Sequence, residues 1–171
     1  MKEIRKRVMK QVQKGKGEAF KKLVQHYHEL VFQVSYFILG EKKKAEDLAK
    51  DTFLYVHSHL DDFFNTNQRF SLWLVHITVR LGEKQMMEVD VVSHRSEINH
   101  KGDYLKTCSH QELHSSLMEI CLQKRLALIF HSNYLFSEQE IGEVLQIPKT
   151  EITSYVWQGR EKLRERLFSA L

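Results

Sequence analysis

The stretch EIGEVLQIPKTEITSYVWQGREKLRERL, residues 140–167, decides the kind of fold. Apolar residues recur at helical spacing on both sides of its Ile-Pro-Lys break. Ser137 and Glu140 fit a capping box, in which each side chain accepts a hydrogen bond from the other's backbone N–H, so a helix begins there. The residue before a proline avoids helical geometry, whereas proline suits the first turn of a helix, so the break falls at Pro148. The stretch therefore predicts two helices joined by a tight turn.

The second of these helices has features typical of a DNA-reading helix. Such a helix lies in the major groove, and groups around it fix its register on the phosphates. Four cations gather towards its end, namely Arg160, Lys162, Arg164 and Arg166. The simplest alternative for them is a solvated helix face. Trp157 lies at the edge of the apolar side, where it either covers the core or stacks against the DNA backbone.

Three further apolar stripes precede this unit, in residues 18–39, 45–60 and 70–81, and each predicts a helix. Trp73 lies on the third stripe, so we expect it in the core. The polar residues 61–68 are expected to form a loop, because asparagine tolerates unusual backbone angles there. Together with the N-terminal segment, the three helices can enclose one small core.

A polar stretch divides the chain into two parts. Residues 88–112 are rich in His, Ser, Asp and Lys, which favours a linker between a domain at 1–87 and a second at 113–171. The chain has one proline, seven glycines and no alternating strand pattern. The predicted fold class is therefore all-α, with two small helical domains joined by a flexible linker.

Composition restricts the location and the partners. The 171 residues carry a formal charge of +4, and seven of the first sixteen are basic, which fits either a nucleic-acid-binding arm or a solvated one. The apolar runs fall short of the ~18 residues that span a membrane, and no signal-peptide core follows the basic start. Two cysteines, Cys108 and Cys121, are too few for a disulfide framework. We expect a cytoplasmic protein.

Enzymatic chemistry finds little support in the motifs. The sequence HQELH, residues 110–114, lacks the glutamate directly after the first histidine that a zinc-protease motif needs. Its two histidines could join Cys108 in a metal site, but we expect no metal, no cofactor and no catalytic residue. No nucleophile elbow or glycine-rich phosphate loop is present. The sequence indicates a protein that is not an enzyme.

Three motifs in this order resemble those of one family, the extracytoplasmic-function sigma factors of RNA polymerase. AEDLAKDTFLYV, residues 45–56, resembles AEDLxQExF, and FSLWLVHIT, residues 70–78, resembles FxxWLxxIA. EIGEVLQIPKTEITSYVWQGREKLR, residues 140–164, resembles EIAxxLGIPxGTVxSRxxRxRxxLR. The resemblance identifies residues 1–87 with sigma region two and residues 113–171 with sigma region four. It implies an alternative sigma factor that directs transcription initiation at specific promoters.

The resemblance also implies partners and site residues. The family binds core RNA polymerase through the beta-prime clamp helices and the beta flap, binds promoter DNA, and is usually held inactive by an anti-sigma factor. The clamp would contact Asp47, Lys50, Asp51 and Leu54. The minus-ten element, as single-stranded DNA, would contact Asn65, Asn67, Gln68, Arg69, Arg80 and Lys84. The minus-thirty-five duplex would contact Lys149, Thr150, Thr153, Ser154, Trp157, Gln158, Arg160 and Arg164.

Several positions depart from the family pattern. Lys50 stands where glutamine is usual, Arg80 where asparagine is common, and Gly142 where alanine usually packs. Thr153 and Gln158 stand where Lys or Arg is frequent, so fewer phosphates would be neutralised. We expect an unusual DNA specificity. The alternative is a sigma-like helix-turn-helix regulator or interaction protein that does not initiate transcription.

Overall fold

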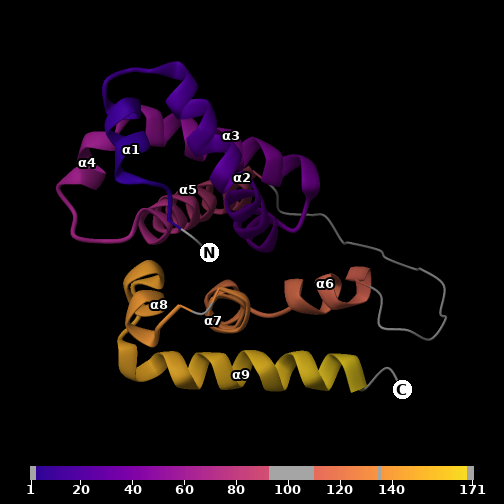
Figure 1. The fold of residues 1–171 in the computed structure, drawn as a ribbon. Coiled ribbons are helices and arrows are strands. Elements are labelled where there is room, and N and C mark those ends of the chain that lie inside the picture. Colours follow the sequence, from indigo (N-terminus) through magenta and orange to yellow (C-terminus); the bar gives the residue numbers. More distant parts are fainter. Residues whose placement is uncertain (1–2, 93–109, 135, 169–171) are drawn as a thin grey trace.

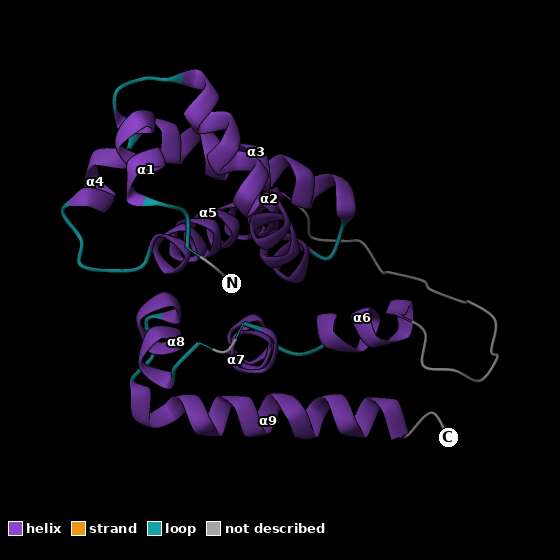
Figure 2. Ribbon diagram, viewed as in Figure 1, coloured by secondary structure: helices purple, strands orange, loops and turns teal. Residues whose placement is uncertain are grey.

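The computed structural model describes residues 3–92, 110–134 and 136–168, which form nine helices and no strand. The first five are α1 (Lys6–Gln13), α2 (Gly17–Leu39), α3 (Lys42–Ser58), α4 (Leu60–Phe64) and α5 (Phe70–Val92). The other four are α6 (His110–Met118), α7 (Leu122–Asn133), α8 (Glu138–Leu145) and α9 (Lys149–Phe168). Figure 1 shows the two groups as two layers, and Figure 2 shows that short loops connect the helices within each. In the described ranges, no helix has both the length and the apolar character to cross a membrane.

Helix α2 forms the centre of the first group and packs against α1, α3 and α5. Its stripe includes Leu23, Val31 and Ile38, which are fully buried. It ends at Gly40, whose φ of 74° is the left-handed geometry that glycine adopts without strain. Trp73 is only 6% exposed, which confirms its predicted place in the core.

The N-terminal segment is folded onto this core as α1. Met9 and Val12 are buried, so one side of the helix is apolar and packed. The Tyr27 hydroxyl accepts a hydrogen bond from the Ile4 amide at 3.1 Å and donates one to Glu3 at 2.9 Å. Burial raises the pKa of Tyr27, so its hydroxyl stays protonated and keeps donating. The basic arm therefore has a defined place on the first group.

Two predicted loops are partly helical. The stretch 61–68 was expected to be a loop, but its first part belongs to α4, where Leu60 is buried and Phe63 packs on the core. The predicted linker 88–112 is wrong at both ends, because α5 continues to Val92 and α6 begins at His110. Met86 packs against the core beyond the third stripe, so α5 stays in contact with it past residue 81. Residues 93–109 of that linker, with Cys108, lie outside the described residues.

The second group is built on α9, which Figure 1 shows running beneath α6, α7 and α8. Phe130 and Leu126 of α7 are fully buried in it. A Cβ added at Gly159 of α9 would lie 2.9 Å from the carbonyl oxygen of Lys124 and 3.3 Å from Leu128 Cβ. The absence of a side chain at this position is what lets α9 approach α7 so closely.

The two groups contact each other through α2 and α5 on one side and α6, α7 and α8 on the other. The rings of Tyr36 and His114 stack with centroids 4.2 Å apart, and the Tyr134 hydroxyl donates to Gln33 at 2.7 Å. Desolvation lowers the pKa of His114, and the charge of a nearby arginine lowers it further. That arginine is Arg125, which is buried and contacts both helix groups.

Arg125 is 3% exposed and joins the two groups. Its guanidinium donates to the backbone carbonyl of Ile38 in α2 at 3.4 Å and to that of Met118 at 3.2 Å. Burial lowers its pKa to about 10, which still leaves it charged at neutral pH. The last carbonyls of a helix carry partial negative charge, so the end of α2 is a suitable partner for a buried cation.

Candidate polymerase and nucleic-acid interfaces

The tight turn between α8 and α9 has the geometry that the sequence predicts. Ser137 Oγ accepts from the Glu140 amide at 3.3 Å, and Glu140 accepts from the Ser137 amide at 2.9 Å, which confirms the capping box. Helix α8 ends at Leu145, and the capping residue after it, Gln146, has a φ of 54°. A Cβ added at Gly142 would lie 2.7 Å from the carbonyl oxygen of Ile147. The turn is therefore too close for the alanine that the family pattern has at this position.

Helix α9 presents a polar face opposite its packed side. Ile152 and Val156 are buried, whereas Thr153, Ser154, Lys149 and Thr150 are exposed. The Thr153 hydroxyl donates to Glu138 at 2.6 Å, and Gln158 donates to Ser154 at 2.9 Å. These side chains therefore lie on one accessible surface, with their polar groups already oriented by neighbours.

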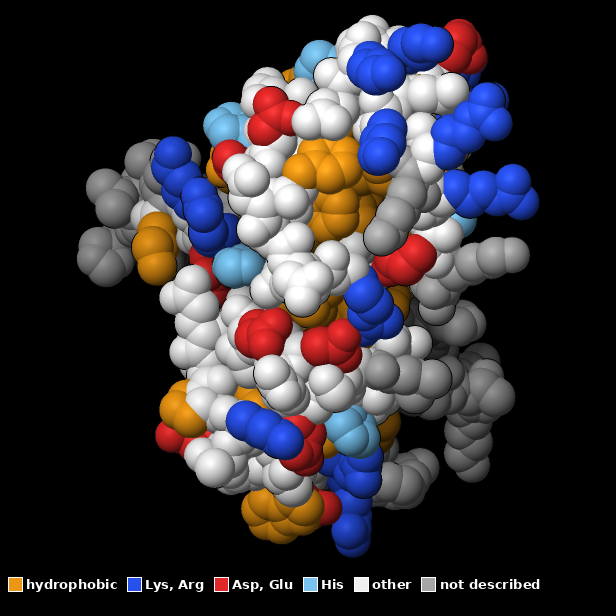
Figure 3. Space-filling model, turned by 60° about the vertical axis from the view of Figure 1, so that its left-hand side comes forward, with side chains coloured by type: hydrophobic (Ala, Val, Ile, Leu, Met, Phe, Trp, Pro, Cys, Tyr) orange, Lys and Arg blue, Asp and Glu red, His pale blue; other side chains and the backbone are white. Residues whose placement is uncertain are grey.

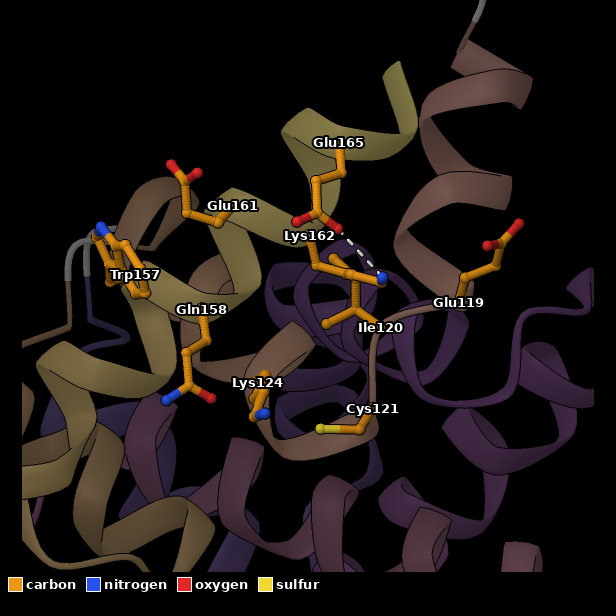
Figure 4. A pocket seen from close by; sticks show the side chains of 9 residues that line it. All are labelled: Glu119, Ile120, Cys121, Lys124, Trp157, Gln158, Glu161, Lys162 and Glu165. Carbon is orange, nitrogen blue, oxygen red and sulfur yellow. Dashed lines mark hydrogen bonds and ion pairs between the residues drawn. The ribbon is translucent and has the colours of Figure 1, made fainter. Parts of the chain in front are cut away.

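Trp157 is the most exposed aromatic residue of this surface, with 62% of its area accessible. Of its two predicted roles, covering the core is therefore wrong. Figure 4 shows its indole at the rim of a groove between α9 and the α6–α7 connection. The groove is lined by Glu119, Ile120, Cys121, Lys124, Trp157, Gln158, Glu161, Lys162 and Glu165.

Acidic residues neutralise part of the charge on α9. Arg164 lies 3.8 Å from Glu161, and Arg166 lies 2.5 Å from Glu119. Lys162 lies 3.2 Å from Glu165. In the part of the chain that the structure describes, Lys149 and Arg160 are exposed cations of this helix with no recorded ion pair.

The α4–α5 connection holds the predicted minus-ten residues, but they differ in accessibility. Asn65 and Asn67 are exposed. Gln68 donates to Glu143 of α8 at 3.4 Å, and the Arg69 guanidinium pairs with Glu140 of the same helix. The guanidinium also lies 5.7 Å from the ring centroid of Phe136. Half of the predicted pocket therefore contacts the helix-turn-helix unit.

Glu140 serves both the capping box and the contact with Arg69. Burial raises the pKa of its carboxyl group, but hydrogen bonds from Ser137 and the charge of Arg69 outweigh this and hold it below its usual value. The carboxylate is therefore ionised throughout the neutral range. Sequence spacing gave no signal of this pair, because residues 69 and 140 come from different helix groups.

The structure does not bring Arg80 and Lys84 to the minus-ten loop. Both are exposed on α5 and share one face, but Arg80 lies eleven residues beyond Arg69, which is roughly 16 Å along a helix. Lys84 lines a shallow groove between α3 and α5 instead. The sequence does carry a signal for this position. Lys84 follows Arg80 by four residues, so both lie on the same face of α5, the helix that packs against α3.

The predicted polymerase-binding residues form one exposed face of α3. Asp47 and Lys50 are paired at 3.1 Å, so the unusual cation is partly compensated. Leu54 is 66% exposed, and Asp51 accepts a hydrogen bond from Gln85 at 3.2 Å. The groove beside them is lined by Asp51, Leu54, Tyr55, Ser58, Leu81, Lys84 and Gln85. An exposed leucine among charges beside a groove is typical of a protein interface.

Comparison with known proteins finds a matching family model and relatives that span nearly the whole chain. Residues 23–82 match the family model of sigma-70 region 2. The ECF RNA polymerase sigma factor SigW of Bacillus subtilis is 27% identical, over 96% of each chain. The RNA polymerase sigma-H factor of Pseudomonas aeruginosa is 21% identical, over 94% of this chain and 92% of the relative.

Solved structures share the fold. The sigma factor RpoE of Bartonella quintana, in complex with the anti-sigma factor NepR, matches with a TM-score of 0.71 and 22% identity. That match covers 86% of this chain and 96% of the other. CnrH, in complex with the cytosolic domain of CnrY, matches with a TM-score of 0.69 and 18% identity, over 95% and 96% of the two chains.

Proposed function

We propose a role in transcription initiation for each surface of this chain, which belongs to the extracytoplasmic-function sigma factors. The chain binds core RNA polymerase and directs transcription initiation at specific promoters. The polymerase performs the chemistry, so this chain needs no catalytic residue, and the cytoplasm is where the two meet. In our proposal residues 1–92 act as region two and residues 110–171 as region four, joined by 93–109.

The α3 face supports a contact with the beta-prime clamp helices. Leu54 offers apolar area at the centre of a charged surface, and Asp51 supplies a carboxylate beside it. Such a centre with a polar rim is how protein interfaces usually distribute binding energy. Region four would contact the beta flap. Because RpoE was solved in complex with the anti-sigma factor NepR, we also propose an anti-sigma partner for this chain.

The exposed face of α9 is proposed to read the minus-thirty-five duplex. Thr153, Ser154 and Gln158 would face the bases, while Lys149, Thr150, Arg160 and Arg164 would lie near phosphates and Trp157 would stack against the backbone. Base-edge contacts carry sequence information, whereas phosphate contacts carry affinity. The observation that supports this assignment is the exposure of these side chains opposite the buried Ile152.

Two alanine variants test how α9 is oriented. Gln158→Ala should relax the preference at one base pair by roughly 1–3 kcal/mol, because a bidentate contact to a base is lost. Arg160→Ala should weaken all sequences alike and reduce the slope of affinity against salt by about one. Binding to a library of minus-thirty-five sequences at several salt concentrations measures both. The opposite pattern would mean that α9 is rotated relative to this assignment.

The loop at 65–69 is proposed to select a base of the melted minus-ten element. Asn65, Asn67 and Gln68 can each donate and accept hydrogen bonds, and Arg69 can hold a phosphate. Arg80 and Lys84 lie farther along α5 and would serve phosphates downstream of the loop. Since Gln68 and Arg69 contact α8, DNA binding requires that the two helix groups separate here.

Glu140→Gln is designed to release Arg69 without disturbing the fold. Glutamine still satisfies a capping box, but it removes the charge that holds the guanidinium. The free protein should bind a single-stranded minus-ten oligonucleotide more tightly, by up to about fivefold, since partly exposed ion pairs contribute about 0.2–1 kcal/mol. Fluorescence anisotropy measures this affinity.

Glu138→Gln is the matched control, because Glu138 contacts Thr153 within the second group rather than the loop. It should leave the oligonucleotide affinity unchanged. An equal gain in both variants would show that general loss of negative charge, not release of Arg69, is responsible.

Run-off transcription tests the function itself. Purified protein mixed with core polymerase should yield defined transcripts from genomic fragments, whereas core polymerase alone should not. The departures from the family pattern at Lys50, Thr153 and Gln158 favour a second candidate function. This candidate is a sigma-like regulator that binds DNA or a partner protein without initiating transcription. It predicts binding to the same fragments with no transcript.

A further inference from the structure

A ridge of positive charge runs along α1 and into the start of α2. It consists of the exposed cations Arg5, Arg7, Lys10, Lys14, Lys16, Lys21 and Lys22, which we call the basic ridge. In the part of the chain that the structure describes, none of them has a recorded ion pair. Figure 3 shows Lys and Arg side chains gathered at the upper end of the face it draws, at the height of the α1–α2 connection in Figure 1.

The apolar side of α1 is not available to a membrane. Basic amphipathic helices that bind membranes insert a free apolar face between lipids. In α1 that face is occupied, because Met9 is 3% exposed and Val12 is 6% exposed, and Val8 packs against the same core. The accessible side of the helix is polar and carries the exposed cations Arg7 and Lys10, which suits a polyanion such as nucleic acid.

The basic ridge is held beside the loop at 65–69 by contacts on both sides of that loop. Gln13 at the end of α1 donates to Asp61 at 2.9 Å, four residues before Asn65. Glu3 accepts from the hydroxyl of Ser71, two residues after Arg69. The ridge and the loop therefore form one unit, and a strand bound in the loop has cations within reach where it leaves.

We propose that the basic ridge is a further DNA-binding surface, in addition to α9 and the loop at 65–69, and that it binds the phosphates of promoter DNA adjacent to the minus-ten element. Lysine and arginine at exposed positions bind phosphates as charges, without reading bases. Three cations of α9 are paired with Glu119, Glu161 and Glu165, which weakens their attraction for phosphates. The basic ridge adds affinity for DNA that compensates for this loss. That the bound phosphates are those beside the minus-ten element rests on the proposed role of the loop, but phosphate binding by the ridge does not.

The test compares two triple variants that remove the same charge. Lys10→Ala, Lys14→Ala and Lys16→Ala together remove the centre of the ridge. The control combines Lys42→Ala, Lys43→Ala and Lys44→Ala, which are exposed lysines at the start of α3. Both are assembled with core polymerase and titrated with a promoter fragment that has a melted minus-ten segment, from about 50 to 200 mM salt.

The ridge variant should lower the slope of log affinity against log salt by about two to three, since each phosphate contact contributes about 0.7–0.9. Its affinity should fall about tenfold or more, while its base preference and its helicity by circular dichroism stay unchanged. The control should keep the slope of the unmodified protein. Equal slopes in the two variants, or binding of the free protein to anionic vesicles that the ridge variant loses, would overturn the proposal.

The same series separates this inference from the proposed function. If the unmodified holoenzyme gives no transcript but the free protein still loses salt-dependent duplex binding in the ridge variant, the function fails and the ridge stands. If transcription and promoter affinity persist unchanged in the ridge variant, the ridge fails and the function stands.

Discussion

Asp51→Arg should lower the affinity of this chain for core RNA polymerase about ten- to a hundredfold, which is about 1.4–2.8 kcal/mol. Asp51 is exposed on α3 beside Leu54, at the proposed clamp contact. The change reverses a charge at an interface where complementary charge matters, and like charges brought together there cost several kcal/mol. It also places a second cation next to Lys50 and removes the acceptor of the Gln85 hydrogen bond.

Pull-down or fluorescence titration with core polymerase, without DNA, measures this effect. Helicity should not change, because the apolar stripe of α3 lies on the opposite side and stays intact. Asp62→Arg is the matched control, since Asp62 is an exposed aspartate on α4, away from the α3 face. Affinity retained by Asp51→Arg would refute the clamp contact and favour the candidate that binds without initiating.

Gly159→Ala should destabilise the second helix group by about 1–3 kcal/mol, the usual cost of overpacking a core. In an exposed helix the same change would stabilise by up to about 1 kcal/mol, because alanine is the better helix former. Here the new methyl group would lie 2.9 Å from the Lys124 carbonyl oxygen, which belongs to backbone and cannot turn aside. Helix α9 would have to move away from α7.

Urea denaturation followed by circular dichroism measures the loss of stability. Gly17→Ala is the matched control, because a Cβ at Gly17 would meet nothing within 4 Å at the start of α2. It should be neutral or slightly stabilising. A Gly159→Ala protein as stable as the unmodified one would contradict the close approach of α7 and α9. With the approach confirmed, the variant should also lose minus-thirty-five binding, because α9 is displaced from α7.

Local signals predicted the helices and the turn well, for a physical reason. The capping box of Ser137 and Glu140 and the proline at 148 act within a few residues, so the sequence records them directly. Apolar spacing likewise identified α2, α3 and the first part of α5. Periodicity failed where packing is set by distant partners, as for α4 and the end of α5.

Contacts between the two helix groups could not be predicted from spacing. Nothing in the sequence around Arg125 distinguishes it from a surface arginine. It is nevertheless buried, and the backbone carbonyl of Ile38 in α2 accepts a hydrogen bond from its guanidinium. Arg69 was predicted as a free phosphate ligand, but the structure pairs it with Glu140. Such pairs depend on how two helix groups dock, which no local rule encodes.

The Glu140 carboxylate has two structural roles at once, because it caps α8 and also pairs with Arg69. Glutamine would meet the first demand and fail the second, whereas alanine would fail both. Substitutions at this position therefore have graded effects, in which the charged contact between the two helix groups is lost before the cap of α8. A protein with glutamine there would keep its helix-turn-helix, and the proposed minus-ten loop would be held to α8 by Gln68 without the charged pair of Arg69.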